Sequence, residues 1–324
     1  MDLLRALKVF IHVIDDHSFA AAARSLDLAP AVVTRLVAEL EEHLGARLIN
    51  RTTRRLALTD VGAEYLTRAR QILADVEEAE ALASSATKEA RGLVRVLVPP
   101  AIAVHQLAKH LPRFHVEQPL VRLELHSPPN VDTVDDEFDV TILMARKPLE
   151  GEFVARRLAR TEVIMCAAPE YLKQHGRPGH PRELPEYDAV LPPTSMMPGG
   201  IELRRTSAGL DAPADEVFRL EPNNRRALMS TSHTDTIYAA ALHGLGLAGL
   251  PSFMIEDALM ENALERVLPE WRMHSFTLWA AMPTRKYVPA RTRVFLDFLL
   301  KIFGGEDQDP WLAAAGCATL PKAT

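Results

Sequence analysis

Two helical patterns within 18–45, separated by only a few residues, constrain the fold of this chain more than any other feature. Ser18 precedes the segment FAAAARSL, where its hydroxyl can cap a helix by accepting a hydrogen bond from an unpaired amide. After a short turn at 27–29, Pro30 suits the first position of a second helix because its missing N–H is not needed there. Gly45 supplies a left-handed stop. Together these signals predict a helix-turn-helix.

The next segment, RLINRTTRRLALT at 47–59, adds an independent signal. Short strands at 48–49 and 56–58 flank the turn RTTRR, which predicts a β-ribbon or wing. The segment holds four arginines and no acid, although the whole chain has a formal net charge of -6. Guanidinium groups neutralise phosphates and fit narrow minor grooves, which favours DNA contact over the alternative of a solvated surface turn. Residues 1–70 hold ten Lys/Arg against nine Asp/Glu, so the basic charge is concentrated in the wing.

A long helix is predicted after the wing, with Thr59 as its cap and Asp60 at its positive end. Small and apolar residues recur every three or four positions along it: Val61, Tyr65, Ala69, Ile72, Val76, Ala79, Ala83 and Ala86. This coiled-coil-like seam has no break until Gly92. It predicts a dimerisation helix, with one more core helix as the alternative interpretation.

Beyond Gly92, strands and helices alternate, which predicts an α/β domain with mixed sheets. Among the predicted strands are FVARRL at 153–158, EVIMCAA at 162–168, IELRRTS at 201–207 and VFRLE at 217–221. The pattern indicates two near-equal lobes, with crossings near 164–168 and 271–275. The segment from 304 onward contains glycines, acids and prolines but little periodicity, so we expect a loosely ordered tail there.

Composition excludes several other classes. A length of 324 residues, 48 % of them hydrophobic and 25 % charged, is typical of a soluble globular protein with more than one domain. Cys166 and Cys317 are far apart and form no CxxC pair, which fits a reducing cytoplasm. Charged residues interrupt the apolar N-terminus, so we expect a helix there and not a signal peptide. No apolar run reaches the roughly 18 residues of a membrane span.

Three residue groups imitate catalytic or metal sites. His105, His110 and His115 are five residues apart, so on a helix they point in different directions and cannot share a metal. The acids within 132–139 are better explained as a solvated helix face than as a divalent-metal cluster. Cys166 lies in the apolar run VIMCAA, which favours a buried strand over a nucleophile. We expect no catalytic residue, metal or cofactor, and therefore no enzyme.

The order of these parts resembles the LysR-type transcriptional regulator family. In the first part, the resemblance depends on SFAAAARSLDLAPAVVTRLVAELEEHLGARLINRTTRRLALTDVGAEYL. In the second, it depends on EFDVTIL, FVARRLARTEVIMCAAPEYLKQHGRPGHPREL and AAALHGLGLAGLPSFM, which alone indicate only a periplasmic-binding-protein-like fold that serves many functions.

The resemblance implies an α/β multidomain protein: a winged helix-turn-helix, a long linker helix and a two-lobed, periplasmic-binding-protein-like effector domain. The expected bounds are 1–59 for the DNA-binding domain, 60–91 for the linker or dimerisation helix, 92–303 for the effector domain and 304–324 for a flexible tail. Within the effector domain, we expect lobe I over about 92–164 and 272–303, and lobe II over about 165–271.

The resemblance also places residues on DNA. On the recognition helix they are Pro30, Ala31, Val32, Thr34, Arg35 and Ala38. On the wing and its base they are Arg51, Thr53, Arg54 and Arg55. Two departures from the family pattern occur. Ala29 replaces the usual capping serine, a loss that costs about 0.5–2 kcal/mol, and Ala31 replaces a frequent small polar residue. The helix start is therefore better suited to thymine methyl groups than to purine acceptors.

In this architecture, the loops after strands and the N-termini of helices form the ligand site. The expected effector contacts are Pro100, Ala101, Ile102, Ser127, Asn130, Ser195, Thr231, His233 and Thr234. The helix starting near Thr234 suits an anion, with a plain N-cap cluster as the alternative. The loop PPAI lacks the hydroxyl often seen there, which predicts a more apolar ligand or fewer contacts.

We therefore predict a cytoplasmic, sequence-specific transcriptional regulator whose activity is set by a small-molecule effector. The resemblance implies binding to double-stranded promoter DNA as a homodimer or homotetramer, with contact to RNA polymerase as a further possible output and no membrane partner. Two alternatives stay open. One is a small-molecule-binding protein or enzyme with an N-terminal dimerisation module that does not bind DNA. The other is a regulator that needs no ligand.

Overall fold

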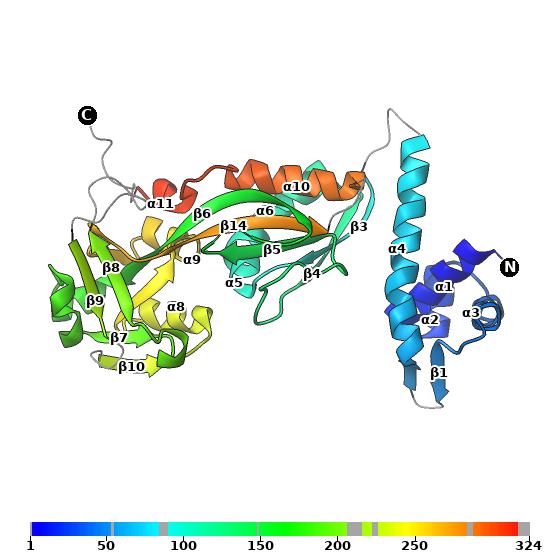
Figure 1. Cartoon of the computed structure of the whole chain (residues 1–324), viewed down its shortest axis with the longest axis horizontal. Helices are drawn as coiled ribbons and strands as arrows, with labels where there is room; N and C mark the ends of the chain where they lie inside the picture. Colours follow the sequence, from blue (N-terminus) through cyan, green and yellow to red (C-terminus); the bar gives the residue numbers. More distant parts are fainter. Residues whose placement is uncertain are drawn as a thin grey trace. The chain divides into compact units, whose positions relative to one another are not determined.

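The computed structural model describes residues 2–52, 55–83, 90–147, 149–205, 216–221, 226–283 and 288–316. The chain divides into two compact units, Met1–Glu89 and Ala90–Thr324, which are described separately below (Figure 1). Within the described ranges, none of the helices has the length and apolar character needed to cross a membrane.

The first unit is a helix-turn-helix followed by a two-stranded ribbon and a long helix. Its elements are α1 (Leu3–Asp15), α2 (Phe19–Ser25), α3 (Pro30–Leu44), β1 (Ile49–Thr52), β2 (Arg55–Leu58) and α4 (Asp60–Ala83). The predicted end signals are confirmed. The Ser18 hydroxyl accepts a hydrogen bond from the Ala21 amide at 3.3 Å, and Gly45 ends α3 with φ +64°.

The first half of α4 completes the core of this unit. Leu66 and Ala69 are buried with residues of α1 and α3, and the Tyr65 ring lies 6.1 Å from the Phe10 ring. Val61 is instead 54 % exposed and Ile72 41 % exposed. The predicted single seam is therefore divided, because some of its residues face the unit's own core and others face outward. Ala86 of that seam lies outside the described residues.

The second unit contains nine strands of one mixed sheet within the described residues: β3 (Gly92–Leu97), β4 (Val121–His126), β5 (Val140–Ala145), β6 (Phe153–Ala167), β7 (Asp188–Leu191), β10 (Arg226–Ser230), β11 (Leu247–Pro251), β12 (Glu265–Val267) and β14 (Ser275–Pro283). The order is β10-β7-β11-β6-β14-β5-β3-β4, with β12 also paired to β6. A smaller described sheet has the order β13 (Trp271–Arg272), β8 (Ile201–Arg205), β9 (Glu216–Leu220).

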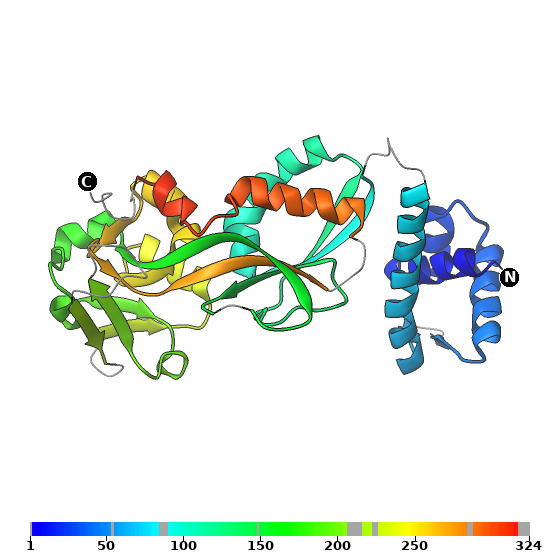
Figure 2. The same cartoon turned by 45° about the horizontal axis from the view of Figure 1, so that its top comes forward.

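Strands β6 and β14 pair antiparallel and run through both lobes of this unit (Figures 1 and 2). Lobe I has β3, β4 and β5 beside β14, and lobe II has β7, β10 and β11 beside the later part of β6. The sequence predicts two strands, at 153–158 and 162–168, but the structure has one continuous strand. Pairing with β14, and then with β11 and β12, satisfies the backbone hydrogen-bonding groups of β6, including those of its arginine-rich middle.

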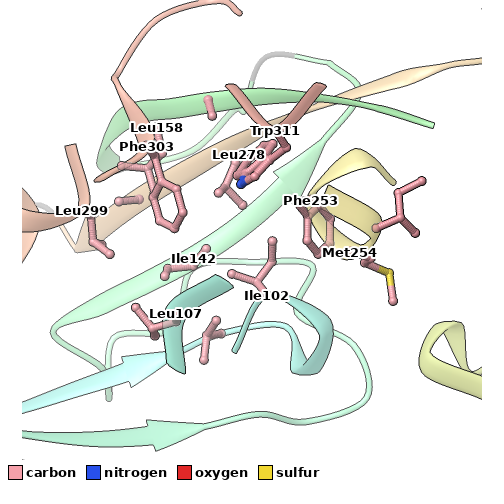
Figure 3. Packing of buried hydrophobic residues seen from close by; sticks show 14 of the residues in the cluster. Ile102, Leu107, Ile142, Leu158, Phe253, Met254, Leu278, Leu299, Phe303 and Trp311 are labelled. Carbon is pink, nitrogen blue, oxygen red and sulfur yellow. The ribbon is translucent and has the colours of Figure 1, made fainter. Parts of the chain in front are cut away.

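Helices cover the sheet, and one apolar core joins the lobes. The α-helices among the described residues are α5 (Pro100–Ile102), α6 (Ala108–Glu117), α7 (Pro169–His175), α8 (Thr234–Leu242), α9 (Ser252–Met260), α10 (Ala290–Phe303) and α11 (Pro310–Ala314). Figure 3 shows Ile102 and Ile142 of lobe I in the same cluster as Phe253 of α9. Burial of this shared apolar surface holds the lobes together along the face that α9 covers.

Two expectations for this unit are wrong. The tail is not loosely ordered throughout, because Trp311 and Leu312 of α11 are buried in the shared core and the Asp309 carboxylate caps the helix. Residues 317–324 lie outside the described residues. The acids within 132–139 do not lie on a helix: they lie in a loop, where Asp139 accepts a hydrogen bond from the Arg95 amide at 2.9 Å.

Candidate nucleic-acid interface and ligand cavity

The outward face of α3 carries the residues expected to meet DNA. Pro30, Ala31, Thr34, Arg35 and Ala38 are exposed, whereas Val32 is half-buried against the core. The opposite face consists of buried residues, namely Val33, Leu36, Val37 and Leu40. The helix is therefore held by one apolar face while the other stays available to a groove.

The start of α3 has no side-chain cap, as the sequence indicates. Ala29 is extended, with φ -68° and ψ 139°, and its carbonyl accepts the Val32 and Val33 amides at 2.9 and 3.3 Å. Pro30 has no N–H, so the Ala31 amide is the donor at this helix start without a partner within the described residues. A free amide at the positive end of a helix suits a phosphate oxygen.

Thr34 and Arg35 follow one turn later. The Thr34 hydroxyl donates to the Pro30 carbonyl at 3.0 Å and keeps acceptor capacity. Arg35 Nε lies 3.6 Å from a Glu39 oxygen, and the arginine side chain is 69 % exposed. Such an exposed pair contributes little stability, so the guanidinium can leave it for a phosphate at low cost.

The β1–β2 ribbon is fixed to both neighbouring helices. The Glu41 carboxylate of α3 accepts the Leu48 and Ile49 amides at 2.8 and 3.1 Å. On the other side, the Thr59 hydroxyl donates to the Arg47 carbonyl at 2.7 Å and accepts the Gly62 amide at 2.9 Å, which confirms the predicted cap of α4. The base of the wing therefore has a defined position next to the recognition helix.

The wing residues themselves are only partly described. Arg51 lies in β1 opposite Leu56, and Arg55 lies in β2 opposite Thr52, so both are in the paired part of the ribbon. Thr53 and Arg54 of the predicted turn lie outside the described residues.

A cavity of about 890 Å³ lies in the second unit, mainly in lobe II beside the strands that connect the lobes. It is bounded by β6, β7 and β11, by the turn at 196–200, by β8 and β9, and by the segment 273–276. Its size lies in the range of small-molecule sites, about 300–1,000 Å³.

Most of the expected effector residues lie elsewhere. Thr234 alone of the nine lines this cavity in the described part of the chain. Ile102 is fully buried in the shared core and does not line the cavity. The others are surface or half-buried positions outside the lining: Pro100, Ala101, Ser127, Asn130, Ser195, Thr231 and His233.

Sequence reasoning missed several arginines that line the cavity. They lie after β5 and on β6, β8, β9 and β10, in that order: Arg146, Arg160, Arg204, Arg219 and Arg226. The segments IELRRTS and VFRLE were predicted only as strands. Their pairing, with Glu202 opposite Arg219, brings charged side chains to one wall. The only sign of this wall in the sequence was that Arg204 and Arg219 lie in predicted strands and not on a helix face. That sign did not show which strands pair.

The electrostatic character of the cavity is positive. Glu202 is the one acid among its described lining residues, and it forms an ion pair with Arg219 at 2.9 Å. Burial, together with the positive charge of Arg146, lowers the pKa of His274 to about 4, so this ring is neutral at pH 7. The excess charge therefore comes from the arginines.

The start of α8 borders this cavity through Thr234, but its next residue already contacts lobe I. His105 Nε2 lies 2.6 Å from an Asp235 oxygen, and buried Gln106 donates to the Phe253 carbonyl at 2.6 Å. His110 instead points toward the Phe303 ring, so these two histidines have separate environments. The acid in the first turn of α8 makes this helix start a poor place for an anion.

A buried polar network lies where β6, α9 and the C-terminal segment meet. Asp309 Oδ2 accepts the Glu162 amide at 2.7 Å and the Ser252 hydroxyl at 2.6 Å. Burial raises the pKa of Asp309 to about 6. The Glu162 carboxylate pairs with Arg272, and both side chains are 3 % exposed.

Cys166 is a buried strand residue, as predicted. Its side chain is 0 % exposed, its thiol donates to the Ala248 carbonyl, and burial raises its pKa to about 12. A thiol in this environment is not reactive at neutral pH. Cys317 lies outside the described residues.

Comparison with known proteins gives matches over almost the whole chain. The family model "LysR substrate binding domain" matches 87–304, and "Bacterial regulatory helix-turn-helix protein, lysR family" matches 4–63. The transcriptional regulator CrgA of Neisseria meningitidis serogroup C is 32 % identical over 302 residues, covering 92 % of this chain and 96 % of that protein. The uncharacterized regulator YhjC of Escherichia coli is 30 % identical over 303 residues, covering 92 % and 97 %.

Solved structures give the same result for the fold. The structure of CrgA from Neisseria meningitidis is 30 % identical, with a TM-score of 0.55, and covers 93 % of this chain and 98 % of that one. A full-length variant of OxyR from Pseudomonas aeruginosa has a TM-score of 0.59 over 92 % and 97 % of the two chains, at 17 % identity.

Proposed function

The chain belongs to the LysR-type family of transcriptional regulators, and from this premise we propose which of its residues contact DNA and which contact an effector. Members are DNA-binding regulators with an effector-binding domain, not enzymes. The alternative of an enzyme or binding protein whose first unit does not bind DNA is therefore not retained.

The first unit binds promoter DNA through α3 and the wing. The observation that carries this proposal is the exposed face of α3 beside a ribbon that Glu41 and Thr59 fix in place. The Ala31 amide, Thr34 and Arg35 contact phosphate, and the Ala31 and Ala38 methyl groups meet base edges, thymine methyl groups above all. Pro30 and Val32 shape the same surface, and Arg51, Thr53, Arg54 and Arg55 contact the adjacent backbone or minor groove.

The long helix pairs with a second copy. Val61 and Ile72 are apolar and exposed on a helix whose Leu66 and Ala69 are already buried in the core of the unit, so a partner helix would cover them. We propose a homodimer or homotetramer, with 1–59 as the DNA-binding domain, 60–91 as the linker and the unit from 92 onward as the effector domain. Contact with RNA polymerase is proposed only as a consequence of promoter binding.

The effector binds in the lobe II cavity. Arg160, Val163 and Met165 of β6 line it together with Ser275 and Phe276 of β14. The same two strands continue into lobe I, so a ligand that prefers one arrangement of β6 and β14 shifts the balance between arrangements of the lobes. That shift changes the spacing of the wings in the oligomer and with it the affinity for DNA.

The DNA-binding proposal is tested by selecting genomic fragments with the full chain and measuring affinity for a selected fragment by fluorescence anisotropy. Arg35→Ala should weaken binding about tenfold, because one charge-assisted phosphate contact is lost. Arg182→Ala, at an exposed position of the second unit, is the matched control and should bind as the parent chain does. Equal affinities for all three proteins would contradict the assignment of α3.

A further inference from the structure

We propose that the effector of this chain is an organic anion, an acid group on an apolar body, held by the arginines of the lobe II cavity. The proposal builds on the proposed function, because it takes this cavity as the effector site. It differs from the expectation raised by the sequence, which places an anion at the start of α8.

Charge is the first argument. Of the five lining arginines, Arg219 is neutralised by Glu202 at 2.9 Å, Arg226 Nε lies 2.7 Å from Asp188, and Arg160 lies 3.9 Å from Asp307. Arg146 and Arg204 have no carboxylate partner within the described residues. Two unpaired guanidinium groups therefore remain at one cavity and favour a negatively charged occupant.

The position of Arg204 strengthens this argument. Its side chain is half-buried on β8, between the buried residue Leu203 and the exposed Arg205. A guanidinium partly removed from water costs free energy unless an acceptor pairs with it. Carboxylate, sulfonate and phosphate groups offer such acceptors, and the planar guanidinium binds them through two parallel hydrogen bonds.

The apolar lining is the second argument. Met165, Met196, Met197, Met273 and Phe276 all face the cavity. Methionine side chains adapt to the shape of an apolar group and make favourable contacts with rings. An inorganic anion would leave this surface uncovered, so the ligand has an apolar body. A volume of about 890 Å³ accommodates a body of one or two rings.

The α8 start provides the contrast. Asp235 lies in its first turn and faces His105 at 2.6 Å, so the positive helix end already has a negative partner. An anion placed there would meet Asp235, whereas in the lobe II cavity it meets Arg146 and Arg204. The geometry therefore favours the arginines of the lobe II cavity over the start of α8 as the anion site.

The test uses two probes that differ by one charged group. The full chain is titrated by calorimetry and fluorescence with 8-anilinonaphthalene-1-sulfonate and with N-phenyl-1-naphthylamine, which lacks the sulfonate. We expect one saturable sulfonate-probe site per chain. Arg146→Ala and Arg204→Ala should each weaken sulfonate-probe binding about tenfold or more and change neutral-probe binding less than about twofold.

Arg205→Ala is the matched control, because Arg205 is the next residue of β8, is exposed and pairs with Glu270. It should leave both affinities unchanged. Thermal unfolding of each variant establishes that the cavity is still formed. Benzoate should displace the sulfonate probe from the parent chain, and benzyl alcohol should not.

Equal binding of the two probes would overturn the proposal, as would unchanged sulfonate-probe affinity in both arginine variants. So would loss of binding in a Thr231→Ala, His233→Ala variant with the arginines intact, because it would return the site to the start of α8. DNA affinity is measured in the same preparations. If the parent chain binds DNA in a salt-dependent way but does not bind the sulfonate probe, only this inference is refuted. If the parent chain does not bind DNA, the proposed function is refuted.

Discussion

The two units fix their functional surfaces by contacts of very different range. In the first unit, Glu41 holds the Leu48 amide, seven residues away, and Thr59 holds the Arg47 carbonyl, twelve residues away. In the second unit, Arg272 pairs with Glu162 across 110 residues, and Asp309 accepts the Glu162 amide across 147. The proposed DNA-binding surface is therefore a property of one short segment, whereas the proposed ligand cavity depends on the assembly of the whole unit.

This difference has a functional consequence. A local surface keeps its shape while the rest of the molecule changes, which suits a fixed reading of DNA. A cavity formed by distant segments changes when any of them moves, which suits a sensor. A substitution should therefore affect mainly the neighbouring residues in the first unit, whereas in the second unit it should affect the stability of the whole unit.

The largest effect is expected from Arg272→Met. The change leaves the buried Glu162 carboxylate without its cation, which should lower the free energy of unfolding of the second unit by about 3–5 kcal/mol. Thermal unfolding followed by calorimetry measures the loss. The double variant Glu162→Met, Arg272→Met should recover part of it, because no unpaired charge remains. A single variant as stable as the parent would contradict the role given to this pair.

A smaller, local effect is expected from Gly62→Ala. An added Cβ would overlap the Leu48 carbonyl, a backbone atom that cannot move without shifting the base of the wing. We expect a loss of about 3 kcal/mol in the first unit and weaker DNA binding, with the second unit unchanged. Gly199→Ala is the control, since an added Cβ there meets nothing within 4 Å. Full DNA affinity in Gly62→Ala would show that α4 does not set the wing position.

The pH dependence of stability should also separate the units. Asp309 has a pKa of about 6 against an ordinary value of 3.8, so the folded state binds its proton more readily than the unfolded state. Its contribution, about 3 kcal/mol, is present below about pH 4 and lost as the pH rises through about 6. His274, with its pKa lowered to about 4, acts in the opposite direction as the pH falls.

Asp309→Asn isolates the first of these contributions. The difference in unfolding free energy between parent and variant should change between pH 4 and pH 7 by about the amount given above, since His274 titrates equally in both. Denaturant unfolding at several pH values measures it. A constant difference across this range would show that Asp309 does not titrate there.

The smallest effect is expected from Ala29→Ser. A serine hydroxyl at this position can accept an amide of the first turn of α3, as Ser18 does for α2, and should stabilise the first unit by about 1 kcal/mol. Thermal unfolding and DNA affinity are compared with the parent. A variant less stable than the parent would show that the extended backbone at Ala29 cannot present a cap.

The sequence separation of the contacts also explains which structural features could be predicted from the sequence. Ser18, Gly45 and Thr59 are end signals read within a few residues, and the structure confirms each of them. Most strands and helices of the second unit were also visible, because burial imposes a local period on the sequence.

Features made by distant contacts were not visible. Trp311 and Leu312 are buried although their segment has the composition of a tail, because the core that receives them comes from other parts of the chain. Arg204 and Arg219 reach the same cavity only because β8 pairs with β9. Nothing in either segment alone indicates that pairing.

The most direct test of the account is the salt dependence of DNA binding by the full chain and by Arg54→Ala. If the wing contacts phosphate, the slope of log affinity against log salt should be steep in the parent and smaller in magnitude by about 1 in the variant. Arg182→Ala should keep the parent slope. Identical slopes for the parent, Arg54→Ala and Arg55→Ala would contradict the claim that this short basic segment contacts the DNA phosphates.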